Sequence, residues 1–286
     1  MRAWQEEAYA KINLTLDVCA LRSDGYHDLE MVMQSVSLSD TVTLELRESP
    51  GIVLEAEGTG LPRDRKNLAV DAAYRLLAVA GQLNQGLSIA IEKRIPVCAG
   101  TAGGSSDAAA VLRGLNRLLG EPFSMEQLMK LGEEVGSDVP YCVLGGTALA
   151  QGRGAVLTPI GKLPDCVIVL CKPGFSVSTP WLFGRIDDKP PSRRPDTKGM
   201  LEALELGDLA LVAERLHNVF EEALPDSQRQ EIVQIRESLC AMGALSACLS
   251  GTGPTVFGIF REAAAAEEAA AKLKEEYQEV FLTKPV

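Results

Sequence analysis

The sequence predicts an α+β protein of two domains, and three observations support this fold class. The chain of 286 residues is long enough for two ordinary domains, and 46% hydrophobic with 23% charged residues is a usual globular composition. The first half alternates strand patterns with helical patterns. The second half has the order strand, helices, two strands, helix and strand, which is typical of a split β-α-β unit of the ferredoxin type. We place the two domains at residues 1–160 and 161–286.

The first domain is supported by a change between two hydrophobic periods. Apolar residues alternate in 40–46 and in 87–93, as expected of half-buried strands. Between them, residues 67–81 carry apolar side chains at helical spacing and end on a glycine, which is a typical C-cap. A second apolar stripe at helical spacing covers residues 111–119. The glycine-rich segment that precedes this stripe therefore joins a strand to a helix.

The second domain begins with a continuous apolar run at residues 167–171, which predicts a strand covered on both faces. Residues 185–199 are rich in proline and charge and are expected to form an exposed loop. Helical patterns fill residues 200–242, so His217 is expected in mid-helix with a structural role. The remaining elements are strands at 245–250 and 255–260, an alanine-rich helix from about 262, and a closing strand at 279–284.

Charge and cysteine usage exclude several classes of protein. A net charge of -11 argues against a general nucleic-acid or anionic-membrane surface. No run approaches the ~18 apolar residues of a membrane span, and Glu6 and Glu7 lie where a signal peptide needs an apolar core. The seven cysteines form no C-x-x-C pair, which indicates reduced, mostly buried thiols. We expect a cytoplasmic protein that binds neither nucleic acid nor membrane.

The segment "PVCAGTAGGSS", residues 96–106, has an unusually bare backbone. Gly100, Gly103 and Gly104 leave amide groups unshielded, and the following helix start favours an anion through its free N–H groups and its dipole. The segment is therefore either a phosphate cradle or only a tight strand-to-helix connection. It lacks both the G-K-[ST] of the P-loop and the G-x-G-x-x-G of dinucleotide-binding folds.

The segment "KRIPVCAGTAGGSSDAA" resembles the phosphate-binding motif of the GHMP kinases, the superfamily of galactokinase, homoserine kinase and mevalonate kinase. "AYAKINLTLDV" before it and "LSGTGPTVFGIF" after it are similar to the superfamily's first and third motifs, in the same order. The resemblance implies a two-domain GHMP kinase fold, with an N-terminal domain like domain 2 of ribosomal protein S5 and a ferredoxin-like C-terminal domain. It also implies ATP as phosphoryl donor together with Mg²⁺. The metal ligands stay open, with Ser105 or Ser106 as a candidate.

The segment Asp24-Gly25-Tyr26-His27 and the later "GSDVPYCVLGGTALAQGRG" narrow the resemblance. They are similar to the branch that phosphorylates the 2-hydroxyl of a cytidine diphosphate derivative of methylerythritol in non-mevalonate isoprenoid synthesis. One alternative is a GHMP kinase acting on homoserine or mevalonate, against which Tyr26 and His27 argue. The other is a catalytically silent sensor, against which Lys11 and Asp138 argue. We expect a monomer or weak homodimer.

The resemblance implies that Lys11 and Asp138 are the catalytic residues. Asp138 takes the proton from the attacking hydroxyl, and Lys11 keeps this carboxylate ionised and meets the transferring charge. Without the resemblance, Asp138 is a helix-capping or turn aspartate. Lys11 interrupts an apolar segment, where a buried ammonium needs a carboxylate or phosphate partner, unless it is a snorkelling lysine at a strand edge.

Nucleotide contacts follow from the same resemblance. The candidates are Asn67, Pro96, Val97, Cys98, Ala99, Gly100, Thr101, Ala102, Gly103, Gly104, Ser105 and Ser106. Asn67 is equally suited to be the N-cap of its helix. Cys98 stands where Gly or Ala is usual in the family, and Thr101 stands where Leu is usual. The resemblance therefore does not fix the local geometry of the loop. Modification of the Cys98 thiol is expected to block ATP.

The acceptor contacts complete the predicted site. The resemblance implies that Tyr26, His27 and Phe183 hold the cytosine, and Asn13 lies on the same strand face as Lys11. Alternatively, Tyr26 belongs to a simple turn and Phe183 to the core. Lys11, the loop amides and a basic residue at 93 or 94 are expected to meet the anionic substrates.

Overall fold

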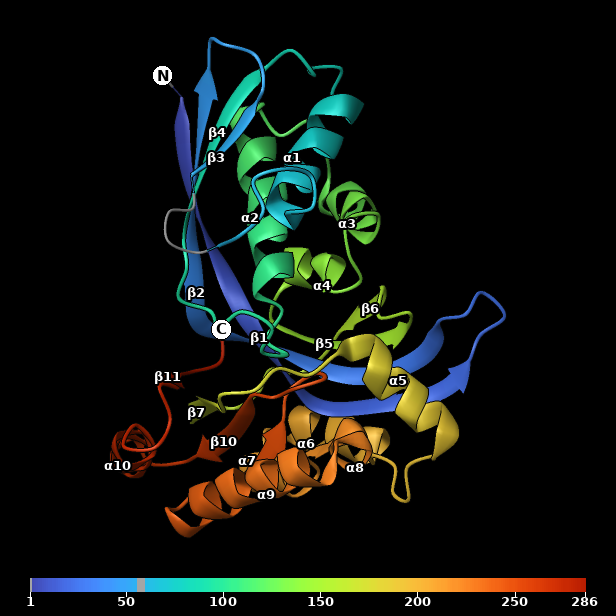
Figure 1. The fold of residues 1–286 in the computed structure, drawn as a ribbon, viewed down its shortest axis with the longest axis vertical. Helices are drawn as coiled ribbons and strands as arrows, with labels where there is room; N and C mark the ends of the chain where they lie inside the picture. Colours follow the sequence, from blue (N-terminus) through green and yellow to red (C-terminus); the bar gives the residue numbers. More distant parts are fainter. Residues whose placement is uncertain (1, 56–59) are drawn as a thin grey trace. The chain divides into compact units, whose positions relative to one another are not determined.

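The computed structural model describes residues 2–55 and 60–286 and divides into two compact units (Figure 1). The first unit lies within residues 1–10, 39–97 and 102–145, and the second comprises residues 11–38, 98–101 and 146–286. Two long strands run through both units, β1 (Ala3–Leu21) and β2 (His27–Arg47). The domain boundary at residue 160 stays a prediction.

The first unit places helices against one face of a small sheet. Besides parts of β1 and β2, its elements are β3 (Ile52–Glu55), α1 (Leu68–Val79), β4 (Gly86–Glu92), α2 (Gly103–Leu118), α3 (Met125–Glu133) and α4 (Val139–Leu144). Strand β4 pairs antiparallel with β2 and parallel with β3. Val42 and Ile89 of the sheet share a core with Leu76 of α1 and Leu112 of α2. The strands and helices predicted in this half are confirmed.

The second unit contains a four-stranded sheet in the order β11-β7-β10-β9, in which every pair is antiparallel. Its strands are β7 (Val167–Lys172), β9 (Ser246–Leu249), β10 (Val256–Phe260) and β11 (Glu279–Thr283). Helices α9 (Asp226–Ala241) and α10 (Ala263–Leu273) pack against this sheet. This strand order confirms the split β-α-β unit predicted from the sequence.

The second unit contains further elements. They are β5 (Thr147–Gly152), β6 (Val156–Pro159), α5 (Thr179–Asp188), α6 (Thr197–Leu206), α7 (Leu209–Glu214), β8 (His217–Asn218) and α8 (Phe220–Ala223). Of these, β5 pairs with β2 and β8 pairs with β1. Two predictions are wrong here. Of the loop predicted at 185–199, residues 185–188 form the last turn of α5 and residues 197–199 begin α6. His217 lies in β8, paired in parallel with Thr15 of β1, because pairing with a distant strand overrides the local helical pattern.

Cysteine exposure differs in part from the prediction. All seven cysteines are free thiols, but Cys19, Cys98 and Cys240 are exposed. Burial raises the pKa of Cys166 and of Cys171 to about 12, so these two thiols stay protonated. Among the helices in residues 2–55 and 60–286, none combines the length and the apolar character needed to cross a membrane.

Candidate functional site

The glycine-rich loop, residues 96–106, has an alternating backbone. Cys98, Gly100 and Ala102 have positive φ angles of 54°, 77° and 59°, whereas the residues between them do not. Such alternation is typical of a nest, in which successive N–H groups turn toward one anion. Left-handed φ angles cost about 1 kcal/mol at each of the two non-glycine residues. Strain of this kind is usually kept at functional sites.

Main-chain segments approach the loop so closely that only glycine fits. A Cβ on Gly100 would lie 2.2 Å from the carbonyl oxygen of Ser250, and one on Gly251 would lie 2.7 Å from the carbonyl oxygen of Gly100. The Ser250 hydroxyl donates a hydrogen bond to this same Gly100 oxygen, at 3.1 Å. The amide of Lys11 donates to the carbonyl oxygen of Thr101, at 3.1 Å. Within the second unit, residues 98–101 of the loop thus contact Lys11 and Ser250–Gly251, which lie in the segments that resemble the first and third motifs.

Lys11 is buried beside this junction, with only 4% of its surface exposed. Its Nζ donates to Oδ1 of Asn13 at 2.6 Å, and the amide of Gly251 donates to the same oxygen at 3.0 Å. The position that a Cβ on Gly251 would occupy is 3.1 Å from Nζ. The alternative of a snorkelling lysine at a strand edge is therefore wrong, and the predicted burial of the ammonium is confirmed. Asn13 is fully buried, and its substrate contact stays a prediction.

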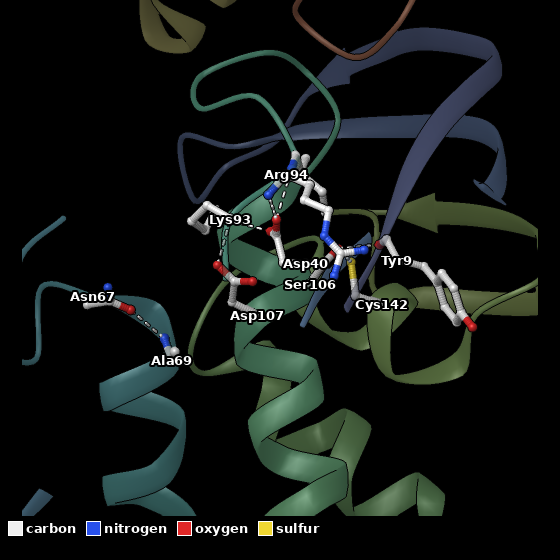
Figure 2. A network of polar contacts seen from close by, with 10 residues as sticks. Tyr9, Asp40, Asn67, Ala69, Lys93, Arg94, Ser106, Asp107 and Cys142 are labelled. Carbon is white, nitrogen blue, oxygen red and sulfur yellow. Dashed lines mark hydrogen bonds and ion pairs between the residues drawn. The ribbon is translucent and has the colours of Figure 1, made fainter. Parts of the chain in front are cut away.

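The start of α2 lies in the first unit, where Figure 2 shows the polar contacts. The hydroxyl of Ser106 donates to the carbonyl oxygen of Tyr9 at 2.6 Å, so its proton is used inside the protein. Oδ1 of Asn67 accepts from the amide of Ala69 at 2.9 Å, which confirms the N-cap interpretation. A nucleotide contact of Asn67 stays a prediction, for which its Nδ2 group is the donor.

Sequence reasoning missed a buried charge cluster behind the start of α2 (Figure 2). The ammonium of Lys93 lies between Asp40 and Asp107, at 2.7 Å from the latter. Burial raises the pKa of Asp107 to about 7, although Lys93 opposes the shift. Because its ammonium is already paired with Asp40 and Asp107, Lys93 is a poor candidate for meeting an anionic substrate. Only the contacts between distant segments reveal this cluster.

Asp138 precedes α4 at the N-cap position, with φ −85° and ψ −12°. Within the described residues, its carboxylate accepts no capping hydrogen bond from the first turn of α4. Asp138 thus occupies the N-cap position that the sequence allows, without a capping hydrogen bond from its side chain to the first turn of α4. Its role as a base stays a prediction.

The aromatic residues predicted to hold the cytosine come partly together. The rings of His27 and Phe183 stack, with centroids 4.8 Å apart and planes at 25°. Nε2 of His27 is 2.8 Å from Oδ1 of Asp187. Tyr26 is 52% exposed, and the guanidinium of Arg153 lies 3.8 Å from its ring centroid. Phe183 on α5 thus adjoins β2, as the resemblance implies, and binding of cytosine stays a prediction.

Two family models match the chain. The GHMP kinases N terminal domain matches residues 67–146, and the GHMP kinases C terminal domain matches residues 200–279. The first match includes Asn67, the whole glycine-rich loop and Asp138. The fold, the loop and these matches define a small-molecule kinase of the GHMP class. The predicted α+β fold of two GHMP kinase domains is confirmed.

Individual relatives narrow this class. The chain is 44% identical over 278 residues to the 4-diphosphocytidyl-2-C-methyl-D-erythritol kinase of Brevibacillus brevis, covering 97% of this chain and 94% of the relative. A crystal structure of 4-(cytidine 5'-diphospho)-2C-methyl-D-erythritol kinase is 32% identical, with a TM-score of 0.83 and 99% of both chains covered. The mevalonate kinase of Methanococcus jannaschii, 14% identical with a TM-score of 0.73 over 100% of this chain and 98% of that one, shares the fold. The chain belongs to the family of 4-diphosphocytidyl-2-C-methyl-D-erythritol kinases.

Proposed function

We propose that the protein transfers the γ-phosphoryl group of ATP to the 2-hydroxyl of 4-diphosphocytidyl-2-C-methyl-D-erythritol. The names of its relatives support this acceptor. The observation that carries the proposal is the buried ammonium of Lys11 beside the bare main chain of Gly100 and Gly251. Phosphoryl transfer needs mainly alignment and charge neutralisation, and this junction supplies fixed positive charge next to amide donors.

The proposed reaction uses the loop, the lysine and a carboxylate. The loop amides bind the phosphates of ATP, because the nest at 98–102 turns N–H groups toward an anion. The Asp138 carboxylate takes the proton of the 2-hydroxyl while the hydroxyl oxygen bonds to the γ-phosphorus. The bond from that phosphorus to the oxygen bridging it to the β-phosphate breaks, and ADP leaves. Lys11 is proposed as the electrostatic partner of Asp138 and stabilises the charge on the transferring group.

The acceptor's cytosine is proposed to bind at the stacked rings of His27 and Phe183. Aromatic faces bind a nucleobase by stacking, and a histidine edge adds a hydrogen bond. The contact between Asp187 and Nε2 fixes the His27 ring and leaves Nδ1 for the base. Tyr26 and Asn13 are proposed as the further acceptor contacts.

Magnesium is proposed to accompany ATP, where it neutralises charge on the β- and γ-phosphates. Across residues 2–55 and 60–286, no three side chains of His, Cys, Asp or Glu gather to hold a metal. This fits Mg²⁺, which commonly keeps water and phosphate oxygens as most of its ligands. The Ser106 hydroxyl donates its proton to Tyr9 and keeps its oxygen lone pairs, so Ser105 and Ser106 both remain proposed protein ligands.

The test is an ADP-release assay with ATP and Mg²⁺ across several alcohols. We expect turnover with 4-diphosphocytidyl-2-C-methyl-D-erythritol and a product heavier by one phosphoryl group in mass spectrometry. Homoserine and mevalonate serve as controls with the acceptors of other GHMP kinases. Faster turnover of either control would refute the proposed acceptor. We further propose a cytoplasmic monomer or weak homodimer, and the seven free thiols support the reducing compartment.

A further inference from the structure

Asn218, the last residue of β8, is a buried polar side chain that the proposed reaction does not use. It is 1% exposed. Its Nδ2 donates to the carbonyl oxygens of Leu249 at 2.9 Å and Gly251 at 2.8 Å. Its Oδ1 accepts from the amide of Phe220 at 3.0 Å. Both donors and the acceptor of the carboxamide are therefore engaged with main chain, which fixes its orientation.

The hydrogen bond from Asn218 to Gly251 connects Asn218 to Lys11 through Asn13. Asn218 holds the carbonyl group of Gly251, and the amide of the same glycine donates to Oδ1 of Asn13. That oxygen also accepts the hydrogen bond from Nζ of Lys11. Gly251 is thus held on one side by Asn218 and on the other by the residue that orients the ammonium. Each of these side chains is at most 4% exposed, so water does not readily replace a lost contact.

The hydrogen bond between Asn218 and Phe220 connects Asn218 to the stacked rings of His27 and Phe183. Oδ1 of Asn218 fixes the amide of Phe220, whose ring meets that of Phe183 edge to face, with centroids 5.0 Å apart and planes at 85°. Phe183 in turn stacks on His27. One carboxamide therefore connects the segment that carries the ammonium with the segment that supports the rings.

We propose that Asn218 is a positioning residue that holds Lys11 and the His27–Phe183 pair in a fixed arrangement. This inference rests on the proposed function, which gives those groups their roles. A side chain here must offer two donors and one acceptor without carrying charge. Only an uncharged carboxamide does this, and glutamine is longer by one methylene. Misplacement of reacting groups by about 1 Å lowers rates up to about 100-fold.

The test is Asn218→Asp, which keeps the size and the acceptor for Phe220 but places a carboxylate oxygen against two carbonyl oxygens. We expect kcat to fall about 10- to 100-fold at pH 8, by loss of alignment. When the introduced carboxyl is protonated, it regains one donor. The ratio of variant to wild-type kcat, measured at equal pH, should therefore rise as the pH falls.

Asn116→Asp is the matched control. Asn116 is 6% exposed, and its side chain also bonds to main chain, donating to the oxygen of Phe123 at 2.9 Å and accepting from its amide at 3.1 Å. We expect this variant to lose stability without a pH-dependent change in kcat per folded molecule, with folding checked by circular dichroism.

Three results would overturn the inference. They are a folded Asn218→Asp with kcat within twofold of wild type at every pH, a ratio that does not change with pH, or an equal loss in Asn116→Asp. If Asn218→Asp does not fold, the same assay is made with Asn218→Ser. A kcat of Asn218→Ser within twofold of wild type would then overturn the inference. The assay uses whichever acceptor the wild type phosphorylates. Failure of 4-diphosphocytidyl-2-C-methyl-D-erythritol as acceptor therefore refutes the proposed function alone.

Discussion

Thr101 in the glycine-rich loop provides a sharp test of the structure, because its hydroxyl is buried and makes no hydrogen bond with the residues that the structure describes. It is 1% exposed, and its Oγ1 has no hydrogen-bond partner in the part of the chain that the structure describes. An unsatisfied buried hydroxyl costs about 1–3 kcal/mol. Thr101→Val keeps the shape and replaces the hydroxyl by a methyl group. We expect a gain of about 1–2 kcal/mol in the free energy of unfolding, and a rise in Tm of about 2–6 °C.

The assay is thermal and urea unfolding, followed by circular dichroism, with Thr147→Val as the matched control. Thr147 is also buried in the second unit, but its hydroxyl donates to Oε1 of Gln34 at 2.7 Å and accepts from the amide of Leu163 at 3.3 Å. The same substitution should there lower the free energy of unfolding by about 1–3 kcal/mol. If Thr101→Val lowers Tm as much as the control does, the Thr101 hydroxyl has a partner and the reasoning is refuted.

Three further predictions concern the loop, the acceptor rings and the charge cluster. Gly104→Ala should fold normally, because its methyl group would meet only a leucine carbon at 3.8 Å, yet raise KM for ATP at least about tenfold by covering the loop amides. Gly100→Ala is the contrasting control and should unfold at a lower temperature than wild type, because its methyl group would lie 2.2 Å from a carbonyl oxygen. A wild-type KM for ATP in Gly104→Ala would argue against a phosphate cradle. Phe183→Ala should raise KM for the cytidine-containing acceptor about tenfold and leave KM for ATP unchanged, since stacking on a base is worth about 1–3 kcal/mol, and an equal rise for both substrates would contradict this role. The raised pKa of Asp107, about 7, means that the folded protein binds this proton more tightly than the unfolded chain. The stabilisation by that proton is complete below about pH 4 and is lost as the pH rises to 7. In urea unfolding, wild type should therefore lose stability relative to Asp107→Asn between about pH 4 and pH 7. If the difference in unfolding free energy between the two proteins is the same at every pH, Asp107 is already ionised in the folded protein.

Local patterns were sufficient for much of the fold. The strand predicted at 87–93 is found as β4 (Gly86–Glu92), and the helix predicted at 67–81 is found as α1, which begins after Asn67. The helix α5 was not predicted, and its last turn was assigned to a loop because residues 185–199 are rich in proline and charge. The strand β8 was missed for a different reason: two residues have no measurable period, and only pairing with Thr15 makes them a strand.

In the candidate site, too, some features could be predicted from the sequence and others depend on contacts between distant segments. The burial of Lys11 was predictable, because a lysine inside an apolar strand pattern must be paired. The partners of Asn218 were not, because they come from the segments at Leu249–Gly251 and Phe220, and no spacing in the sequence joins them. Either Lys93 or Arg94 was expected to meet substrate charge, and Lys93 remained a candidate because its partners Asp40 and Asp107 come from other segments of the chain.

The most direct test of the proposed chemistry is Asp138→Asn, a change that keeps the size of the side chain and removes the base. Turnover of 4-diphosphocytidyl-2-C-methyl-D-erythritol should fall about 10²–10⁴-fold, while the Kd for ATP, measured by calorimetry, stays within about twofold of wild type. Wild-type turnover in a folded Asp138→Asn would contradict the assignment of Asp138 as the base, and with it the proposed mechanism.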